Sequence, residues 1–171
     1  MKRLAYTIIA LLSFCVVSQG QTVTTKSDPT KGVREAFDRL MDGIRQVDAE
    51  KVMSVYDNSE QTLFFNNNGT ATLGWKTMKE VREKSYSRTK NVSLEITGLR
   101  IEMLGAAAAY ITCKWKQSQE FDGSPENASG RMTLVFRKLG KEWKVVHLHT
   151  SPDSPAASRP VMPSERATPA Q

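Results

Sequence analysis

The sequence predicts an α+β domain whose elements follow the order ααββαββββ. Three observations support this prediction. Apolar residues recur at helical spacing over residues 28–57, an Asn-Gly pair then separates two short apolar segments, and apolar and polar residues alternate through much of residues 91–151. We therefore expect residues 28–151 to form one domain of ordinary size.

Two helices are expected to open the domain. Asp28-Pro29 is a good helix start, because Asp can cap free amides and Pro fits the first turn. The residues that follow form one apolar face at i, i+4, i+7, i+8 and i+11: Val33, Phe37, Leu40, Met41 and Ile44. Asp48 begins a second, shorter helix, DAEKVMSVYD, over residues 48–57.

The period then changes to that of strands. Asn68-Gly69 lies between residues 61–66 and 70–75, which predicts a β-hairpin because both turn residues tolerate positive φ. A third helix is expected next, with an apolar face made of Trp75, Met78, Val81 and Tyr86.

Four long strands are expected to complete the domain. Residues 91–105 form the first, with Gly98 at a bulge or bend, and residues 106–119 form the second. The segment DGSPENASG, residues 122–130, is expected to be a loop. Residues 130–151 then form a closing hairpin that turns at Gly140.

Residues 1–20 have the layout of a cleavable secretory signal, since Lys2 and Arg3 precede an apolar run that ends in small residues. The run is too short for a stable membrane span. A lipoprotein signal at Cys15 is the alternative, but Phe14 stands where a small residue is needed. We expect a secreted or periplasmic protein, a flexible segment over residues 21–27 and a disordered Pro/Ser/Ala-rich tail over residues 152–171.

The formal charge of +6 indicates a soluble basic surface rather than a nucleic-acid-binding protein, because no arginine-rich block, zinc spacing or aromatic–basic motif accompanies it. Removal of the signal leaves Cys113 as the single thiol, which excludes an internal disulfide. No phosphate-binding glycine loop, serine elbow or paired-carboxylate motif is present, and no cofactor is expected.

Three stretches resemble the nuclear-transport-factor-2-like superfamily, especially its SnoaL-like members and the association domain of calmodulin-dependent kinases. They are DAEKVMSVYD, LGAAAAYITCKW and RMTLVFRKLGKEWKVVHLHTS, and the resemblance spans roughly residues 30–151. It implies a cone-shaped α+β barrel, in which a curved antiparallel sheet wraps around three helices. It also implies a pocket in the open end of the cone and frequent dimerisation through the sheet.

His147 and His149 are the two histidines of the chain, and in a regular strand they share one face, about 7 Å apart. Zinc or iron needs further ligands, and no third histidine exists, so we expect no metal site. A role in acid–base catalysis needs a carboxylate partner, which the sequence does not place. The third reading is structural, with both imidazoles hydrogen-bonded in the sheet or at a dimer interface.

A closing hairpin that turns at Gly140 and Lys141 predicts a register. Its pairs are Phe136 with Val145, Leu134 with His147, and Met132 with His149. The face that contains these residues, together with Trp143, Ile111, Cys113 and Trp115, is largely apolar and is expected to be the inner one. The opposite face carries Arg131, Thr133, Val146, Leu148 and Thr150, with Tyr110, Thr112 and Lys114 on the neighbouring strand.

The resemblance also suggests ligand-binding candidates. Positions similar to Thr112, Thr133 and Thr150 are pocket arginines in the kinase association domain, and Arg131 could replace one of those charges for a small anion. Tyr56 and Trp75 are further candidates, since both follow helix faces near the mouth of the first hairpin. The alternative for the strand positions is a solvated face.

The steroid isomerases of the superfamily use a carboxylate base after the opening helices, but the comparable stretch here is FFNNNG, which offers Asn66, Asn67 and Asn68 and no base. Our leading hypothesis is therefore a homodimeric, non-enzymatic domain that binds a small, partly apolar molecule. The alternatives are an isomerase, cyclase or dehydratase that uses His147 or His149, and a protein association module.

Overall fold

The computed structural model describes residues 28–153. The predicted signal segment, residues 21–27 and residues 154–171 of the predicted tail lie outside this range, so export and the order of the tail stay predictions. Within the described residues, no helix is long and apolar enough to cross a membrane.

Three helices form where the sequence predicts them: α1 (Lys31–Arg45), α2 (Ala49–Val55) and α3 (Trp75–Tyr86). Asp48 caps α2, since its carboxylate accepts a hydrogen bond from the Lys51 amide at 2.8 Å. Asp28 instead binds the amide of Thr30 at 2.8 Å, so α1 starts at Lys31, slightly later than expected.

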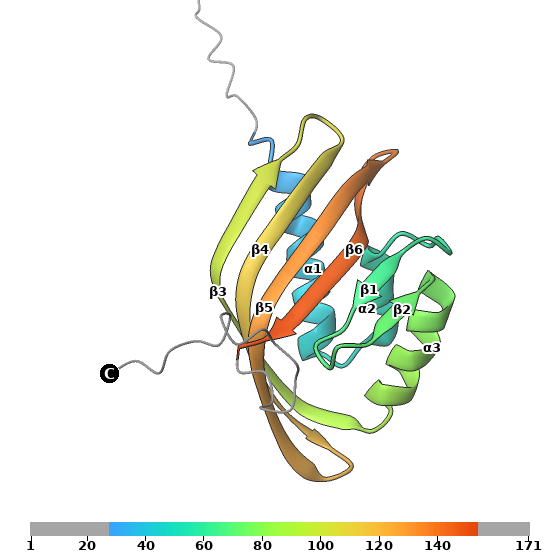
Figure 1. The fold of residues 1–171 in the computed structure, drawn as a ribbon, viewed down its shortest axis with the longest axis vertical. Helices are drawn as coiled ribbons and strands as arrows, with labels where there is room; N and C mark the ends of the chain where they lie inside the picture. Colours follow the sequence, from blue (N-terminus) through green and yellow to red (C-terminus); the bar gives the residue numbers. More distant parts are fainter. Residues whose placement is uncertain (1–27, 154–171) are drawn as a thin grey trace, which may run out of the picture.

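Six strands form one curved, unclosed sheet in the order β2-β1-β6-β5-β4-β3 (Figure 1). Their bounds are Leu63–Phe65 for β1, Ala71–Leu73 for β2, Thr89–Met103 for β3, Ala108–Phe121 for β4, Ser124–Leu139 for β5 and Glu142–Pro152 for β6. The α+β fold class is confirmed. One pair departs from an antiparallel sheet, because β1 runs parallel to β6.

The turns follow the glycines. Gly98 has a φ of 61° at a register shift in β3, and Gly140 has a φ of 61° at the turn into β6, so both predicted positions are confirmed. The predicted loop over residues 122–130 is wrong. Asp122 and Gly123 adopt positive φ and make a two-residue turn, and β5 already begins at Ser124.

A β-bulge corrects the predicted register of the closing hairpin. Phe136 pairs with Val145 as expected, but Val135 pairs with His147, so Val146 is an extra residue in β6. Beyond the bulge, Leu134 pairs with Leu148, and Met132 pairs with Thr150, not with the histidines. An extra residue reverses the direction of every later side chain.

The helices cover one face of the sheet, which we call the inner face, and α1 lies across the four long strands (Figure 1). The Trp143 side chain is 7 % exposed, so the predicted inner face is confirmed for the part of β6 before the bulge. Beyond the bulge, the predicted inward positions of His147 and His149 are wrong. The inner side chains of the long strands form the core with α1 and α2: Leu94, Ala109, Ile111, Cys113, Met132, Leu134, Phe136, Trp143, Val145 and Leu148.

Candidate functional site

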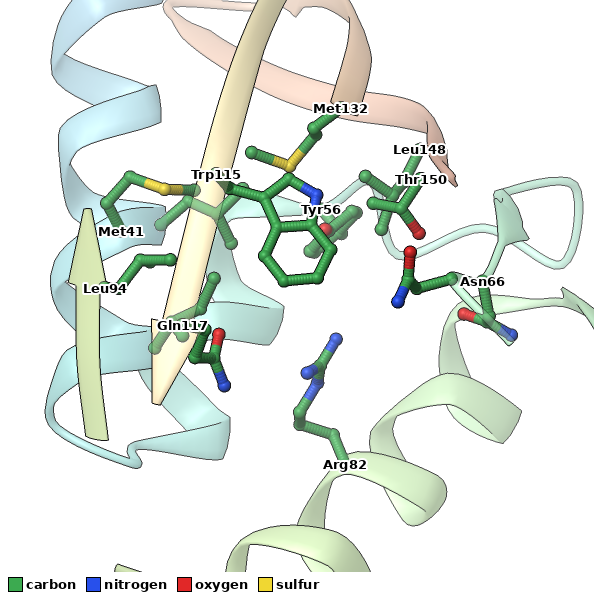
Figure 2. Close-up of a pocket in the computed structure, with 13 residues that line it drawn as sticks. Met41, Tyr56, Asn66, Arg82, Leu94, Trp115, Gln117, Met132, Leu148 and Thr150 are labelled. Carbon is green, nitrogen blue, oxygen red and sulfur yellow. The ribbon is translucent and has the colours of Figure 1, made fainter. Parts of the chain in front are cut away.

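A cavity of about 210 Å³ lies between the helices and the inner face of the sheet (Figure 2). Apolar side chains of α1 and the long strands form one part of its wall. Polar side chains of α3, the β1–β2 loop and the strands form the rest. The lining residues are Leu40, Met41, Ile44, Tyr56, Asn66, Asn67, Arg82, Leu94, Trp115, Gln117, Met132, Leu148 and Thr150. A partly open cavity that combines apolar walls with a few convergent polar groups is a common form of small-molecule site.

Arg82 carries the one charge among the described residues that line this cavity. Its guanidinium points from α3 into the cavity (Figure 2), and its Cζ lies 5.3 Å from the centroid of the Tyr86 ring. Arg82 takes part in none of the ion pairs that form within residues 28–153. A partly buried cation therefore faces the cavity without a counterion.

Three buried polar atoms of the lining have no hydrogen-bond partner: Asn67 Oδ1, Arg82 Nε and Trp115 Nε1. Most buried polar groups in proteins are satisfied, and each exception carries a free-energy penalty. Unsatisfied donors and acceptors that gather around one cavity indicate polar groups available to a ligand.

The backbone at Gly130 makes room for the Trp115 side chain. Gly130 pairs with Trp115 across β4 and β5, and a Cβ at Gly130 would lie 3.1 Å from the indole and 2.2 Å from the Ser151 carbonyl oxygen. A larger residue would displace both neighbours. The absence of a side chain at this position therefore lets the indole extend along the sheet into the cavity wall.

Tyr56 follows α2 and is 3 % exposed, with its ring 4.9 Å from the Phe64 ring. Burial raises the pKa of its hydroxyl to about 12, while the Arg82 charge acts in the opposite direction. The hydroxyl is therefore protonated at neutral pH. It can donate or accept a hydrogen bond in the cavity but does not serve as a base.

The structure separates the predicted binding residues into two groups. Tyr56 and Thr150 line the cavity, and Thr150 reaches it because the bulge moves it to the inner face. Thr112, Thr133 and Arg131 lie on the outer face of the sheet, where Thr112 pairs with Thr133.

Trp75 lies at the start of α3, where its Nε1 donates to the Met53 carbonyl at 2.8 Å. It packs against the core and is not among the residues that line the cavity.

The bulge also places His147 and His149 on the outer face. His147 Nδ1 lies 3.0 Å from the Leu63 carbonyl oxygen of β1. Both imidazoles contact the Phe65 ring edge-on, at centroid distances of 5.3 and 5.6 Å. These contacts agree with the structural reading of the histidines. Among residues 28–153, no three His, Cys, Asp or Glu side chains come close enough together to hold a metal ion.

Arg82 and Gln117 are not among the residues predicted from the sequence, and Trp115 is predicted only as part of the apolar inner face. A signal for Arg82 exists, because Trp75, Met78, Arg82 and Tyr86 follow one another at i, i+3, i+7 and i+11. The expected face used Val81 instead, but Val81 is 53 % exposed. An arginine on the buried side of a short helix was therefore the available clue.

Comparison with solved structures gives many matches to one fold. A nuclear transport factor 2-like superfamily protein from Salmonella enterica is 21% identical with a TM-score of 0.68, covering 78% of this chain and 97% of its own. A ketosteroid isomerase-like protein from Erwinia carotovora is 16% identical with a TM-score of 0.64, covering 75% and 99%. A protein from Xanthomonas campestris, provisionally named a calcium/calmodulin-dependent protein kinase II association domain, is 16% identical with a TM-score of 0.60, covering 70% and 84%.

These identities support a shared fold and leave function to the site itself. A search of curated protein sequences gave no match. The sequence profile of the SnoaL-like domain family matches residues 33–156, which include every residue of the cavity lining. The chain therefore belongs to the SnoaL-like domain family, and its fold is the one found in nuclear transport factor 2-like proteins.

Proposed function

We propose that this domain binds a small, partly apolar molecule in the cavity without transforming it. One observation carries the proposal: unsatisfied polar atoms from α3, β4 and the β1–β2 loop border a cavity that apolar side chains of α1 and the long strands also line. A ligand with an apolar body and one polar end would contact the apolar side chains and supply hydrogen-bond partners to these polar atoms.

The alternative is an enzyme, as the name of the ketosteroid isomerase-like structure suggests for that protein. Proton transfer requires a group that can accept a proton near neutral pH. The described lining contains no Asp, Glu or His, and the stretch FFNNNG contributes the amides of Asn66 and Asn67. His147 and His149 lie on the outer face and do not line the cavity. The composition of the lining therefore favours binding over acid–base catalysis.

The indole N–H signals of the three tryptophans test the proposal in ¹⁵N-labelled protein. Benzyl alcohol, benzamide and benzoate should shift the Trp115 signal, while Trp143, at the far end of the inner face, stays unchanged. Ile44→Phe, which fills part of the cavity, should weaken these shifts, and Ile101→Phe, outside the cavity, should not. If no probe shifts Trp115 at about 10 mM, well above a millimolar Kd, the proposal is wrong.

We also propose that the domain self-associates through the outer face. The centre of this face is uncharged, with Phe65 41 % exposed beside the two histidines, and Val135 and Tyr110 on adjacent strands. Sedimentation velocity should detect a dimer. Val135→Glu should dissociate it, whereas Thr97→Glu, on the outer face of the edge strand β3, should leave it intact. A monomer at all concentrations would contradict this proposal.

The layout of residues 1–20 further supports the proposal that the domain acts after export. Expression of the full chain with its leader in a secreting host, followed by N-terminal sequencing of the secreted product, is the test. We expect a new N-terminus near residue 21. Retention of the full-length chain inside the cell would contradict export.

A further inference from the structure

We propose that the molecule bound in the cavity is a small carboxylic acid whose carboxylate contacts Arg82 and whose apolar body lies between α1 and the long strands. This inference rests on the proposed binding function and adds the chemical class of the ligand. It assigns anion recognition to α3, and not to the outer-face Arg131 suggested by the sequence.

Arg82 is a partly buried cation without an ion-pair partner among the described residues. A guanidinium that is partly withdrawn from water normally acquires a carboxylate or phosphate partner, because an uncompensated buried charge is costly. Two acids near this part of α3, Glu50 and Glu83, already pair with Lys79. Arg82 has no such partner among the described residues, and its Nε is buried without any acceptor. A ligand carboxylate would supply both the charge and the acceptor.

The Tyr86 ring holds the Arg82 side chain in place. Its guanidinium packs against the Tyr86 ring one turn further along α3, which restricts its motion. Held in this way, it presents N–H donors in the planar geometry that matches a carboxylate.

The described residues that line the cavity include no carboxylate that would compete with a ligand for Arg82. The Asp48 carboxylate, whose charge reaches the nearby Tyr86, lies outside this lining and accepts a hydrogen bond from the Lys51 amide at the start of α2. The other polar groups suit such a ligand: Trp115 Nε1 is a free donor, and the amides of Asn67 and Gln117 can offer N–H₂ groups after rotation. By contrast, an organic cation would find Arg82 in its way.

The volume of the cavity suits a small ligand. The cavity of about 210 Å³ is somewhat larger than the roughly 150 Å³ apolar cavity that accepts benzene in an engineered protein. The apolar side chains of Met41, Leu94 and Met132 line the region away from Arg82 (Figure 2). An acid with one ring, or with a short branched chain, fits this volume.

Three probes of nearly equal shape test the charge: benzoate, benzamide and benzamidine carry negative, zero and positive charge. Each is titrated into the protein while the Trp115 indole N–H signal is followed. We expect benzoate to bind about tenfold to a hundredfold more tightly than benzamide, as a hydrogen bond between two charged groups allows. Benzamidine should bind most weakly, and added salt should reduce the preference for benzoate.

Arg82→Met and Arg131→Met form the matched pair of variants. Arg82→Met should remove the preference for benzoate over benzamide while benzamide binding persists. Arg131→Met, which changes an exposed arginine of the outer face, should leave the preference intact. Thermal unfolding of each variant establishes that it is folded, and persistent benzamide binding shows that the cavity of Arg82→Met is intact.

The outcomes separate the two proposals. Equal binding of benzoate and benzamide, or a preference that survives Arg82→Met, overturns the carboxylic-acid inference and leaves small-molecule binding standing. A preference lost in Arg131→Met places anion recognition on the outer face and also overturns it. If none of the three probes shifts Trp115, the inference fails, and if benzyl alcohol also leaves the signal unchanged, the proposed function fails with it.

Discussion

The bulge at Val146 makes a prediction that distinguishes the observed register from a regular hairpin. In the structure, the Leu148 side chain is buried, with 7 % exposure, and His149 is exposed on the other face. A regular hairpin would reverse these environments. Leu148→Ala and His149→Ala should therefore have very different effects on the free energy of unfolding.

The magnitude for Leu148 follows from its surroundings. Burial of a leucine side chain contributes about 1.5–3 kcal/mol, and an enclosed void left by its removal adds a further cost. Leu148 already borders the 210 Å³ cavity, so the new space joins a volume that is partly open and the void term is small. We expect Leu148→Ala to cost about 2–3 kcal/mol.

Removal of the His149 side chain should change the free energy of unfolding less. Its ring makes one edge-on contact with Phe65, which is itself 41 % exposed. His149→Ala should therefore change stability by no more than about 1 kcal/mol.

Urea unfolding, followed by far-ultraviolet circular dichroism, measures both variants against the parent chain. The m-value should be unchanged, so that the shift in midpoint reports stability alone. A loss for His149→Ala equal to or greater than that for Leu148→Ala would refute the bulged register and the assignment of the inner face beyond it.

Three further predictions concern stability. Trp143→Ala should lower the free energy of unfolding by about 3–5 kcal/mol in a urea titration, and a loss below about 1 kcal/mol would contradict its burial. Gly130→Ala should cost about 1–3 kcal/mol, because its Cβ would collide with the Ser151 carbonyl; an unchanged melting temperature would contradict this close approach. Burial raises the pKa of Tyr56 to about 12, so the unfolded chain releases this proton first and stability falls as the pH rises from 10.0 to about 12. Over that pH range, the free energy of unfolding of Tyr56→Phe should fall by up to about 2–3 kcal/mol less than that of the parent. Parallel curves of stability against pH would show that the pKa of Tyr56 is not raised.

Much of the fold follows from local signals in the sequence. Helical spacing and a capping Asp48 predict α1 and α2, and positive-φ residues at Gly98 and Gly140 predict a bend and a turn that the structure contains. Such features depend on neighbouring residues, so a single sequence is enough to find them. The Asp122-Gly123 turn carried an equally local signal that the loop assignment overlooked.

The site depended on longer-range information. Strand alternation predicts faces only while the register is regular, and the extra residue at Val146 reversed Leu148, Thr150 and both histidines together. Nothing in WKVVHLHTSP itself marks where the bulge falls, because the pairing with β5 and with the parallel strand β1 decides it.

The sequence by itself determined the order of the elements, the apolar face that contains Trp143, and membership of a family with a curved sheet over helices. Only the tertiary structure decided which polar groups meet. Arg82, Trp115 and Asn67 lie on α3, β4 and the β1–β2 loop, and their unmet hydrogen bonds become visible once packing has closed a cavity around them. Local periodicity selects helices and strands, whereas the satisfaction of a buried polar atom depends on every element that packs around it.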